Sequence, residues 1–429
     1  MHKKKVVIVG GGFGGITAAK NLKEDSFEIV LIDRTNHHLF QPLLYQVASA
    51  ALSPGDIAVP IRLIFSGRYN IEIMMSEVLS VNKEESFVQL KDRKVYFDYL
   101  ILAPGSSHSY FGKNEWEEYA PGLKTLNDAL SIREKILRSF EEAEMLMKKS
   151  QREKFLSFVI VGGGPTGVEM AGAIAEIVKH TMLKDFRNLD PKETKIYLIE
   201  AGSKILPAYS DKLSSAAKHD LENMGVNVIL NTKVTNISEE GVSAGEEFIP
   251  TNNVIWAAGN QASPLLTSLD VELDRAGRVL VEKDLSVKNY PNIFVIGDAA
   301  NVRNEKGELL PGIAPAAMQQ GRYAAETIED DLHGIQRKPF SYFDKGIMAT
   351  IGKRKAIAKI RKLEFSKGTA WFLWSFVHIF FLISFRNRFR VMAEWIWYYF
   401  TSRRGVRLIT THPQKKIFDE EVLDEKEIY

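Results

Sequence analysis

A chain of 429 residues is long enough to form two or three domains with sizeable cores. Its 56 basic and 54 acidic residues leave a formal net charge of +2, which gives no reason to expect a nucleic-acid partner. The sequence contains no cysteine, and this excludes thiolate metal sites, iron–sulfur clusters and a redox-active disulfide.

A glycine-rich turn follows the first expected strand. Residues 6–9 form a β-branched apolar run, and Gly10, Gly12 and Gly15 then fit the pattern G-x-G-x-x-G before a helix that opens at residues 16–22. In this setting the first glycine makes a tight turn, the second admits a pyrophosphate close to the backbone, and the third lets helix and strand pack closely. The phosphates are bound at the helix N-terminus, where free N–H groups favour negative charge.

An acidic residue completes this first unit. Residues 28–32 are the expected second strand, and Asp33, at its end, lies 18 residues past Gly15. A spacing near the usual ~20 residues places the carboxylate where it can bind the ribose hydroxyls of an adenosine.

The same order of strand, glycine motif, helix and acidic residue occurs again in the middle of the chain. After a second apolar run, Gly162, Gly164 and Gly167 repeat the glycine pattern, and Glu200 ends the next expected strand. Glu200 lies 33 residues past Gly167, so we interpret residues 181–194 as an inserted surface segment. One glycine motif can reflect packing alone, whereas two motifs, each with strand, helix and acid in order, predict that the protein binds two dinucleotides.

The N-terminus resembles a signal peptide only superficially. Residues 2–5 are basic and precede an apolar run, but the glycines that follow belong to the nucleotide turn and no small-residue cleavage site comes after them. We therefore expect a mature cytosolic N-terminus. No uninterrupted apolar run reaches 18 residues, so we expect no membrane-spanning helix.

Two neighbouring stretches have competing interpretations. His37 and His38 could suggest a metal, but adjacent residues do not share a helix face and no third ligand is nearby, so we expect a loop with an apolar anchor. In the Phe40–Tyr45 stretch, Gln41–Pro42 favours an extended backbone, which suits a wall beside a flat cofactor. Packing alone explains that stretch equally well.

The middle of the chain predicts a duplicated architecture. Residues 69–102 alternate polar and apolar side chains and predict several strands, the last of which runs into the turn 103–106. Residues 254–259 nearly repeat that strand and turn, which indicates two similar domains, one inserted into the other. Between the repeats, residues 127–155 are highly charged and are interpreted as a solvated bridging helix.

The chain then returns to the first domain. Residues 292–300 predict a strand that ends in Gly297–Asp298, where glycine permits close backbone approach and Asp298 can accept hydrogen bonds from sugar hydroxyls. Structural capping is the alternative for this aspartate. The small residues in 311–323 would let the start of the next helix approach a ring system, with Gln319 or Gln320 as polar partner; packing is an equal alternative.

The last ninety residues change character. From residue 371 to 400, 13 of 30 side chains are aromatic, and four of the six tryptophans of the chain lie there. Aromatic-rich amphipathic helices with arginines bind the headgroup region of membranes, although a dimer interface is also enriched in these residues. His378 is better explained as a packed or interfacial residue than as a ligand. The flanking basic clusters are Arg386, Arg388 and Arg390, then Arg403, Arg404 and Arg407.

Taken together, the whole chain resembles the type II NADH:quinone oxidoreductases, the non-proton-pumping NADH dehydrogenases. The C-terminal match is the most specific, because glycine motifs are shared by the wider two-dinucleotide flavoprotein superfamily. The matching segments are Gly10–Gly15, His38–Tyr45, Gly162–Glu169, Trp256–Gly259, Gly297–Asp298, Phe385–Arg388 and Arg404–Gly405.

This resemblance implies an α/β fold with two Rossmann-like dinucleotide-binding domains, the NADH domain inserted into the FAD domain, plus C-terminal amphipathic membrane-anchoring helices. The implied boundaries are residues 1–120 and 286–340 for the FAD domain, 121–285 for the NADH domain, and 341–429 for the membrane-association and dimerisation region.

The resemblance also assigns site residues. Non-covalent FAD would be bound by Gly10, Gly12, Gly14, Gly15, Asp33, Arg34, Gln41, Ala103, Gly105, Gly297, Asp298 and Ala317, and NADH by Gly162, Gly164, Gly167, Glu169, Glu200, Ala258 and Gly259. The carboxylate of Glu200 should repel the extra phosphate of NADPH.

Glu169 and Gln320 would be the catalytic residues. Glu169 matches a glutamate near nicotinamide and flavin that affects the quinone reaction, with a first-turn acid that complements the helix dipole as the alternative. Pro315 departs from the family pattern Ala-Gln and puts a simple transfer of the quinone-site residues in doubt.

The activity implied is hydride transfer from NADH to FAD and then of two electrons to a membrane quinone, without proton pumping. The enzyme would be a peripheral homodimer on the cytoplasmic face of the cell membrane. Sulfide:quinone reductases and disulfide reductases depend on cysteines that this chain lacks. A soluble NADH oxidase or reductase, or a flavin-based redox-sensing interaction protein, stays as the alternative.

Overall fold

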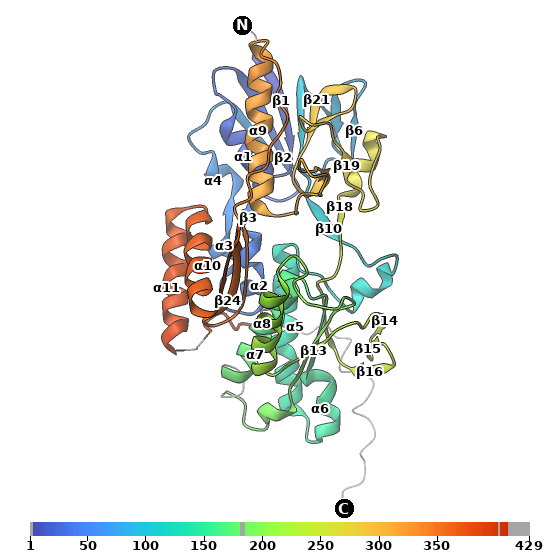
Figure 1. The fold of residues 1–429 in the computed structure, drawn as a ribbon, viewed down its shortest axis with the longest axis vertical. Coiled ribbons are helices and arrows are strands. Elements are labelled where there is room, and N and C mark those ends of the chain that lie inside the picture. The colour runs from blue at the N-terminus through green and yellow to red at the C-terminus, as the bar shows by residue number, and fades with distance from the viewer. Residues whose placement is uncertain (1–2, 181–184, 402–403, 411–429) are drawn as a thin grey trace, which may run out of the picture.

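The computed structural model describes residues 3–180, 185–401 and 404–410, and a parallel sheet lies in each end of the elongated molecule (Figure 1). In the first sheet, β1 pairs in parallel with β2 and β9, β2 with β5, and β9 with β21, while β20 is antiparallel. Val6, Val7 and Ile8 are fully buried in β1, as expected for a strand covered on both faces. In sheet order the strands are β20 Ser286–Val287, β21 Tyr290–Val295, β9 Tyr99–Leu102, β1 Lys4–Val9, β2 Phe27–Asp33 and β5 Ile71–Met75.

Helices α1 (Phe13–Asn21) and α9 (Ala314–Leu332) pack closely beside this sheet (Figure 1). A Cβ at Gly321 would lie 2.3 Å from the carbonyl oxygen of Gly14, so the crossing requires glycine there. This contact brings the start of α9 to the end of the sheet where the first glycine turn lies.

The second sheet is fully parallel, in the order β13–β12–β11–β17. Its strands are β11 Ser157–Val161, β12 Lys195–Ile199, β13 Val226–Ile229 and β17 Asn253–Trp256, and its helices are α5 Leu126–Met145, α6 Lys149–Leu156, α7 Pro165–His180 and α8 Asp211–Asn223. The expected insert before β12 contains a short 3₁₀ helix at Pro191–Glu193, while residues 181–184 lie outside the described residues.

The interpretation of residues 127–155 as a solvated bridging helix is wrong. Helix α5 buries Ile132, Ile136 and Phe140 in the core of the second unit, because its apolar residues recur at helical spacing despite the high total charge. Its start is fixed by a capping box in which Thr125 and Asp128 bond each other's backbone N–H groups.

The expected loop at His37–His38 is instead strand β3 (His37–Leu39), paired with β4 (Ala58–Pro60). His38 is buried, and its Nδ1 donates to the carbonyl of Gly11 at 2.9 Å. Burial lowers the pKa of His38, so a neutral ring packs behind the first glycine turn. Within the described residues no group of three or more potential ligands could hold a metal.

Smaller elements complete both units. The strands expected over residues 69–102 are confirmed, with β6, β7 and β8 forming an antiparallel sheet, and β14, β15 and β16 form another. Their bounds are β6 Ser80–Asn82, β7 Phe87–Gln89, β8 Lys94–Tyr96, β14 Val234–Ser238, β15 Gly241–Ala244 and β16 Glu247–Pro250. Further short elements are α2 Leu44–Ala48, α3 Pro54–Ile57, α4 Ile61–Ile64, β19 Val279–Leu280 and β22 Ala300–Asn301. Gln41–Leu43 forms a 3₁₀ helix, so the extended backbone expected at Gln41–Pro42 is wrong.

The chain passes between the two units twice, and the two passages pair as β10 (Ser106–His108) and β18 (Asn260–Ala262). Leu266, Leu269 and Val279 pack in the core of the first unit, although the expected boundary put residues up to 285 in the second. The division into domains stays a prediction, and these contacts favour an earlier return to the first unit.

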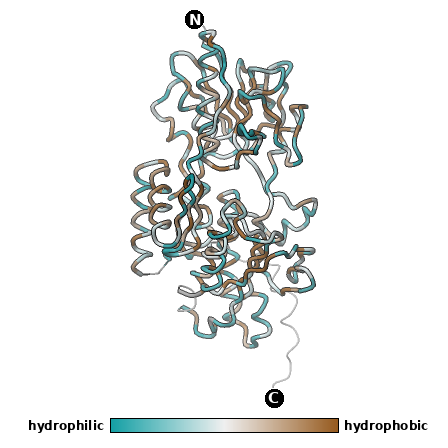
Figure 2. Tube along the Cα trace, in the orientation of Figure 1, coloured by the Kyte–Doolittle hydropathy of each residue, from teal (hydrophilic) through white to brown (hydrophobic). Residues whose placement is uncertain are grey.

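A small antiparallel sheet and two helices follow α9. They are β23 Ile347–Gly352, β24 Lys355–Ile360, β25 Leu363–Ser366, α10 Lys367–Phe381 and α11 Phe385–Thr401. A Cβ at Gly172 in α7 would lie 1.8 Å from the carbonyl oxygen of Ile351, so glycine is required where β23 crosses α7. Apolar residues concentrate in the two parallel sheets and recur along α10 and α11 (Figure 2). In the described part of the chain, no helix is long and apolar enough to cross a membrane.

Candidate functional site

The first glycine turn has the geometry of a phosphate-binding loop. Gly10 has φ +105°, and a Cβ there would lie 2.2 Å from the carbonyl oxygen of Ala103; a Cβ at Gly15 would lie 1.9 Å from the carbonyl oxygen of Gly10. A Cβ at Gly12 would meet nothing within 4 Å, so this residue borders open space at the start of α1. The loop thus leaves room for a ligand at the helix N-terminus.

The second glycine turn repeats this geometry. Gly162 has φ +109°, a Cβ at Gly167 would lie 1.9 Å from the carbonyl oxygen of Gly162, and a Cβ at Gly164 would meet nothing within 4 Å. The strand-end acids also correspond: Oδ2 of Asp33 accepts from the Gly11 N–H and Oε2 of Glu200 accepts from the Gly163 N–H, each at 2.6 Å. The two open cradles with their acids fit two dinucleotides, as the sequence predicts.

Asp298 lies at the centre of a polar cluster beside the first turn. Ser106 Oγ donates to Asp298 Oδ2 at 2.6 Å, and Lys124 Nζ donates to Ser106 Oγ at 3.0 Å. Burial lowers the pKa of Lys124, while the charge of Asp298 opposes that shift. Gly297, Ala317 and other residues around Asp298 line a hollow at the start of α9.

Other predicted cofactor residues surround these turns. Gln41 is exposed, with Nε2 donating to the carbonyl of Lys124 at 3.2 Å, and Arg34 is exposed next to Asp33. Gly105 and Gly259 occupy equivalent turns with φ of +74° and +76°. Ala103 is the first residue after β9, and Ala258 is the second residue after β17. The strand-and-turn repeat expected from the sequence is therefore present.

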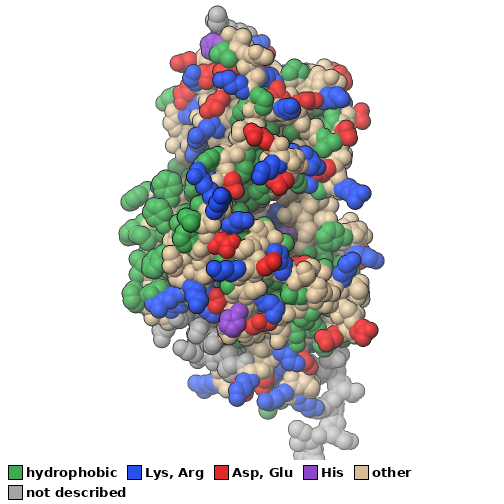
Figure 3. Space-filling view, viewed as in Figure 1, with side chains coloured by type: hydrophobic (Ala, Val, Ile, Leu, Met, Phe, Trp, Pro, Cys, Tyr) green, Lys and Arg blue, Asp and Glu red, His purple; other side chains and the backbone are tan. Residues whose placement is uncertain are grey.

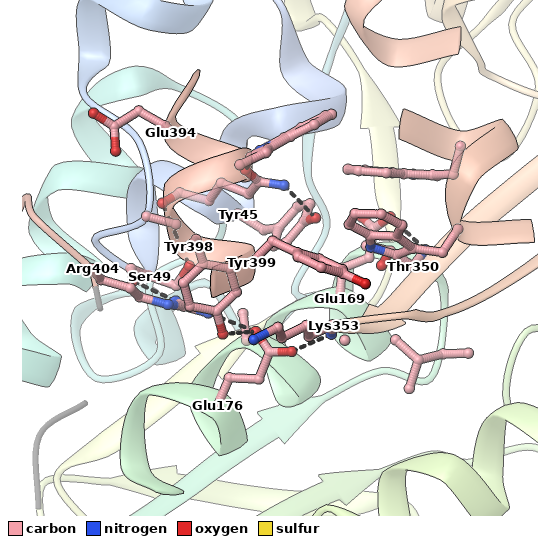
Figure 4. A pocket seen from close by; sticks show the side chains of 18 residues that line it. Tyr45, Ser49, Glu169, Glu176, Thr350, Lys353, Glu394, Tyr398, Tyr399 and Arg404 are labelled. Carbon is pink, nitrogen blue, oxygen red and sulfur yellow. Dashed lines mark hydrogen bonds and ion pairs between the residues drawn. The ribbon is translucent and has the colours of Figure 1, made fainter. Parts of the chain in front are cut away.

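A separate pocket lies where α2, α7, β23, α10 and α11 meet (Figure 4). The pocket opens to solvent, and its space amounts to about 720 Å³ with the open mouth included. Its walls are largely aromatic, with a few polar groups between them. The lining includes Tyr45, Gln46, Glu169, Glu176, Thr350, Trp371, Trp374, Trp395, Tyr398, Tyr399 and Arg404.

Glu169 is an acidic residue in this pocket whose pKa the protein shifts into the range of neutral pH. Burial raises the pKa of Glu169 to about 8, opposed by one hydrogen bond from the Thr350 N–H at 3.5 Å. The carboxyl therefore holds its proton at neutral pH. Tyr45 nearby is buried, and that burial together with the charge of Glu169 raises its pKa, so its phenol stays neutral.

Gln320, the other predicted catalytic residue, lies elsewhere. Its side chain is 3% exposed, and its Oε1 accepts from the Gly297 N–H at 2.6 Å. It lines the hollow around Asp298, whereas Glu169 lines the aromatic pocket. The structure does not bring the two residues into one described pocket.

Several pocket residues were missed by the sequence reasoning. Glu176 is a buried acid seven residues after Glu169 on α7. Tyr45, in contrast, belongs to the Phe40–Tyr45 stretch that was predicted as a wall beside a flat cofactor. Arg404 was expected in a headgroup-facing basic cluster, and this is wrong: it is 5% exposed and its Nη2 lies 2.9 Å from Glu176 Oε2. Helical spacing could have marked Glu176, but no local signal marks the burial of Arg404. Arg403 lies outside the described residues.

His378 is packed, as expected. Its ring stacks on Trp374 with 4.2 Å between centroids, and its Nδ1 donates to the Trp374 carbonyl at 2.7 Å. Burial lowers its pKa to about 4, which keeps the ring neutral.

Comparison with known proteins agrees with this geometry. Residues 4–321 match the pyridine nucleotide-disulphide oxidoreductase family, and residues 345–404 match the NDH2 C-terminal domain. The type II NADH:quinone oxidoreductase Ndh of Mycobacterium tuberculosis is 41% identical over 425 residues, which cover 95% of this chain and 91% of that protein. NdhA of the same organism is 42% identical over 427 residues, covering 95% and 90%.

The chain belongs to the type II NADH:quinone oxidoreductases. NDH2 from Plasmodium falciparum, solved in complex with NADH, has the same fold with a TM-score of 0.87, covering 94% of this chain and 100% of that one at 22% identity. The sulfide:quinone oxidoreductase of Aquifex aeolicus shares the fold at a TM-score of 0.71, covering 90% and 92% at 18% identity. The family, the fold class and the pair of cofactors expected from the sequence are confirmed. The roles of individual residues stay predictions.

As a type II NADH:quinone oxidoreductase, the protein should prefer NADH because of Glu200. We expect Glu200→Gln to lower the ratio of kcat/KM for NADH over NADPH roughly tenfold, since repulsion between two nearby charges at a protein surface amounts to ~1–4 kcal/mol. Steady-state kinetics with both nucleotides measure this ratio.

Asp33→Asn is the matched control at the equivalent position of the first turn. It should weaken FAD retention on a desalting column and leave the nucleotide preference unchanged. A shift of preference in Asp33→Asn, but not in Glu200→Gln, would mean that the two cofactor sites are assigned the wrong way round.

Proposed function

We propose that this chain passes two electrons from NADH, through FAD, to a quinone bound in the aromatic pocket between α7, β23, α10 and α11. The observation that carries this proposal is the pocket itself. Its aromatic walls suit a flat quinone ring, and Glu169, a carboxyl group that keeps its proton near neutral pH, lines the same space (Figure 4). The family to which the chain belongs transfers electrons from NADH to quinones.

The described residues fit both cofactors. The open cradles at Gly12 and Gly164 would receive the two pyrophosphates, and Asp33 and Glu200 the two riboses. Asp298 and the start of α9 would hold the remaining part of FAD. When bound, FAD supplies the two-electron carrier between NADH and the quinone. The protein's contribution is to align the partners and to exclude water.

Glu169 would supply a proton to the reduced quinone. The hydride of NADH carries two electrons and one proton, so reduction of a quinone to a quinol needs one further proton. A carboxyl with a pKa of about 8 holds a proton at neutral pH, can release it to a nearby basic oxygen and is then reprotonated from solvent. Tyr45 and Thr350 frame this carboxyl from α2 and β23. Its predicted contact to NADH is the competing role, which the two half-reactions distinguish.

Two half-reactions test the function. We expect NADH to bleach the flavin absorbance of the purified holoenzyme anaerobically and a short-chain quinone to restore it, over repeated cycles in a stopped-flow instrument. A redox sensor would stay reduced with quinone in excess, and an NADH oxidase would be reoxidised by oxygen faster than by quinone. Either result would contradict the proposal.

The pH dependence of the second half-reaction tests Glu169. Because burial raises its pKa to about 8, the carboxyl is protonated below that pH and charged above it, so reoxidation by quinone should slow as the pH rises through about 8. Glu169→Gln cannot donate a proton, and we expect it to slow reoxidation ~10²-fold at neutral pH and to remove this pH dependence. Reduction by NADH in the same samples is the internal control. An equal loss in both half-reactions would instead assign Glu169 to the NADH site.

We also propose that the outer face of α10 and α11 binds the membrane surface. Phe372, Phe376 and Phe380 recur every four residues along α10 and are 58–69% exposed. Hydrophobic side chains gather over α10 and α11, at the left of Figure 3. On α11, Phe385, Phe389 and Phe400 are likewise exposed, and Arg386 and Arg390 stand beside them. Exposed aromatics with cations are typical of helices that lie at the headgroup level. We also propose that the protein forms a homodimer on the cytoplasmic face of the cell membrane.

The triple variant Phe372→Ser/Phe376→Ser/Phe380→Ser tests this surface. We expect it to bind vesicles of phosphatidylcholine and phosphatidylglycerol at least ~10-fold more weakly in a sedimentation assay, because burying each ring stabilises binding by ~1.5–3 kcal/mol at most. Tyr69→Ser/Tyr96→Ser/Phe248→Ser removes three exposed rings elsewhere and should bind normally. Unchanged vesicle binding with loss of a dimer, measured by analytical ultracentrifugation, would assign this face to subunit contact.

A further inference from the structure

Glu176 is the acceptor on which several C-terminal segments converge. Its Oε2 accepts from Tyr398 Oη at 2.7 Å and from Arg404 Nη2 at 2.9 Å, and its Oε1 accepts from the backbone N–H of Lys353 (Figure 4). Tyr398 belongs to α11, Arg404 follows that helix, and Lys353 follows β23. Glu176 itself lies on α7, which begins at the second nucleotide turn. One carboxylate thus joins three points of the C-terminal region to the nucleotide-binding unit.

Arg404 extends this connection to a further element. Its Nη1 donates to the carbonyl of Ser49 at 2.6 Å, at the end of α2, and its guanidinium lies 5.3 Å from the centroid of the Tyr398 ring. The side chains of Arg404 and Glu176 are only 3% and 10% exposed. The guanidinium is therefore held by α7, α2 and α11 together. A lysine would carry a compact ammonium in place of the planar fork, whose two terminal nitrogens bond Glu176 and Ser49 separately.

We infer that Glu176 and Arg404 form a positioning pair that holds the α11 wall of the aromatic pocket in place. Trp395, Tyr398 and Tyr399 form that wall, and none of the three comes from the nucleotide-binding units. The inference rests on the proposed function, in which the pocket receives the quinone. The pair acts through α11, so its effect falls on quinone binding and not on hydride transfer from NADH.

A second polar link holds the same wall of the pocket at another point. Trp395 Nε1 donates to Gln46 Oε1 at 2.8 Å, and Gln46 Nε2 donates to Tyr45 Oη at 2.8 Å. This link fixes the middle of α11 to α2, whereas the Glu176–Arg404 pair fixes its C-terminal end. Without the pair, α11 still contacts its neighbours through Trp395, through Arg390 beside Asp56 and through Tyr399 beside Arg354, but its last turns lose their polar links to α7.

General stabilisation is the competing explanation. A buried ion pair is weak evidence for stability, because the cost of desolvating two charges offsets their attraction, whereas removal of one partner leaves the other charged and buried. A purely structural role would lower the stability of the whole protein. A positioning role predicts a local change at α11 and a selective change in the quinone half-reaction.

The test uses the FAD-loaded full chain and Arg404→Met. We expect amide hydrogen exchange of peptides covering residues 385–401 to accelerate roughly tenfold or more, since hydrogen bonds to a charged group are among the strongest in proteins. The KM for a short-chain quinone should rise by a similar factor, and the rate of flavin reduction by NADH should stay within about twofold of the wild-type rate. Unchanged exchange of α11, or an equal loss in both half-reactions, overturns the inference.

Lys355→Met is the matched control. Lys355 on β24 pairs with Asp220 on α8 at 3.5 Å, so it also joins the C-terminal region to the second unit, but it does not line the pocket. This variant should leave both α11 exchange and the quinone KM unchanged. An equal increase in Lys355→Met would mean that any such ion pair has the effect, and this too would overturn the inference.

Tyr398→Phe decides the question if Arg404→Met does not fold. It removes one donor to Glu176 and leaves the ion pair intact, so we expect faster exchange at the end of α11 and a smaller rise in the quinone KM. No change in either measurement would overturn the inference. A wild-type protein that NADH reduces but quinone cannot reoxidise would refute the proposed function instead, while the exchange measurements would still report on the pair.

Discussion

The close approach of α7 to β23 is the contact on which the site depends. Only a glycine at residue 172 lets the strand cross at this distance, because a side chain would meet the carbonyl oxygen of Ile351. The crossing lays the C-terminal sheet on a helix that starts at a dinucleotide turn. Glu169, Ala173 and Glu176, at i, i+4 and i+7 on that helix, consequently line one pocket with Thr350 of the strand.

The two carboxylates on α7 have different surroundings, and this difference separates their roles. Glu169 has one long hydrogen bond from a backbone N–H, so burial dominates and its pKa rises. Glu176 accepts from two side chains and one backbone N–H, including the guanidinium of Arg404. Environments that separate two acids in this way suit one of them to hold a proton and the other to hold the structure.

The nucleotide-binding units were predictable because their signals are local. Gly10, Gly15 and Asp33 fall within one βαβ unit, and each contact that makes the turn involves residues of that unit or the strand beside it. Arg404 could not be predicted, because its partner Glu176 is 228 positions away and only its place between α7 and the end of α2 removes the arginine from solvent. The high charge of residues 127–155 likewise led to a wrong prediction for α5. The buried face of this helix is set by the spacing of its apolar residues and not by its total number of charges.

The aromatic residues of α10 and α11 are divided between an inner and an outer face of this pair of helices. Trp374 and Trp395 turn inward, where the indole N–H of Trp395 finds Gln46, while Phe372, Phe376 and Phe380, which have no polar group, turn outward. The pocket wall and the exposed apolar face are therefore opposite sides of one two-helix layer. If the outer face lies on lipid, as we propose, the wall of the pocket is formed by the same two helices that contact the membrane. Composition identified the tail as a surface for lipid or protein contact, but only the fold shows that the inward face of the same helices lines a pocket.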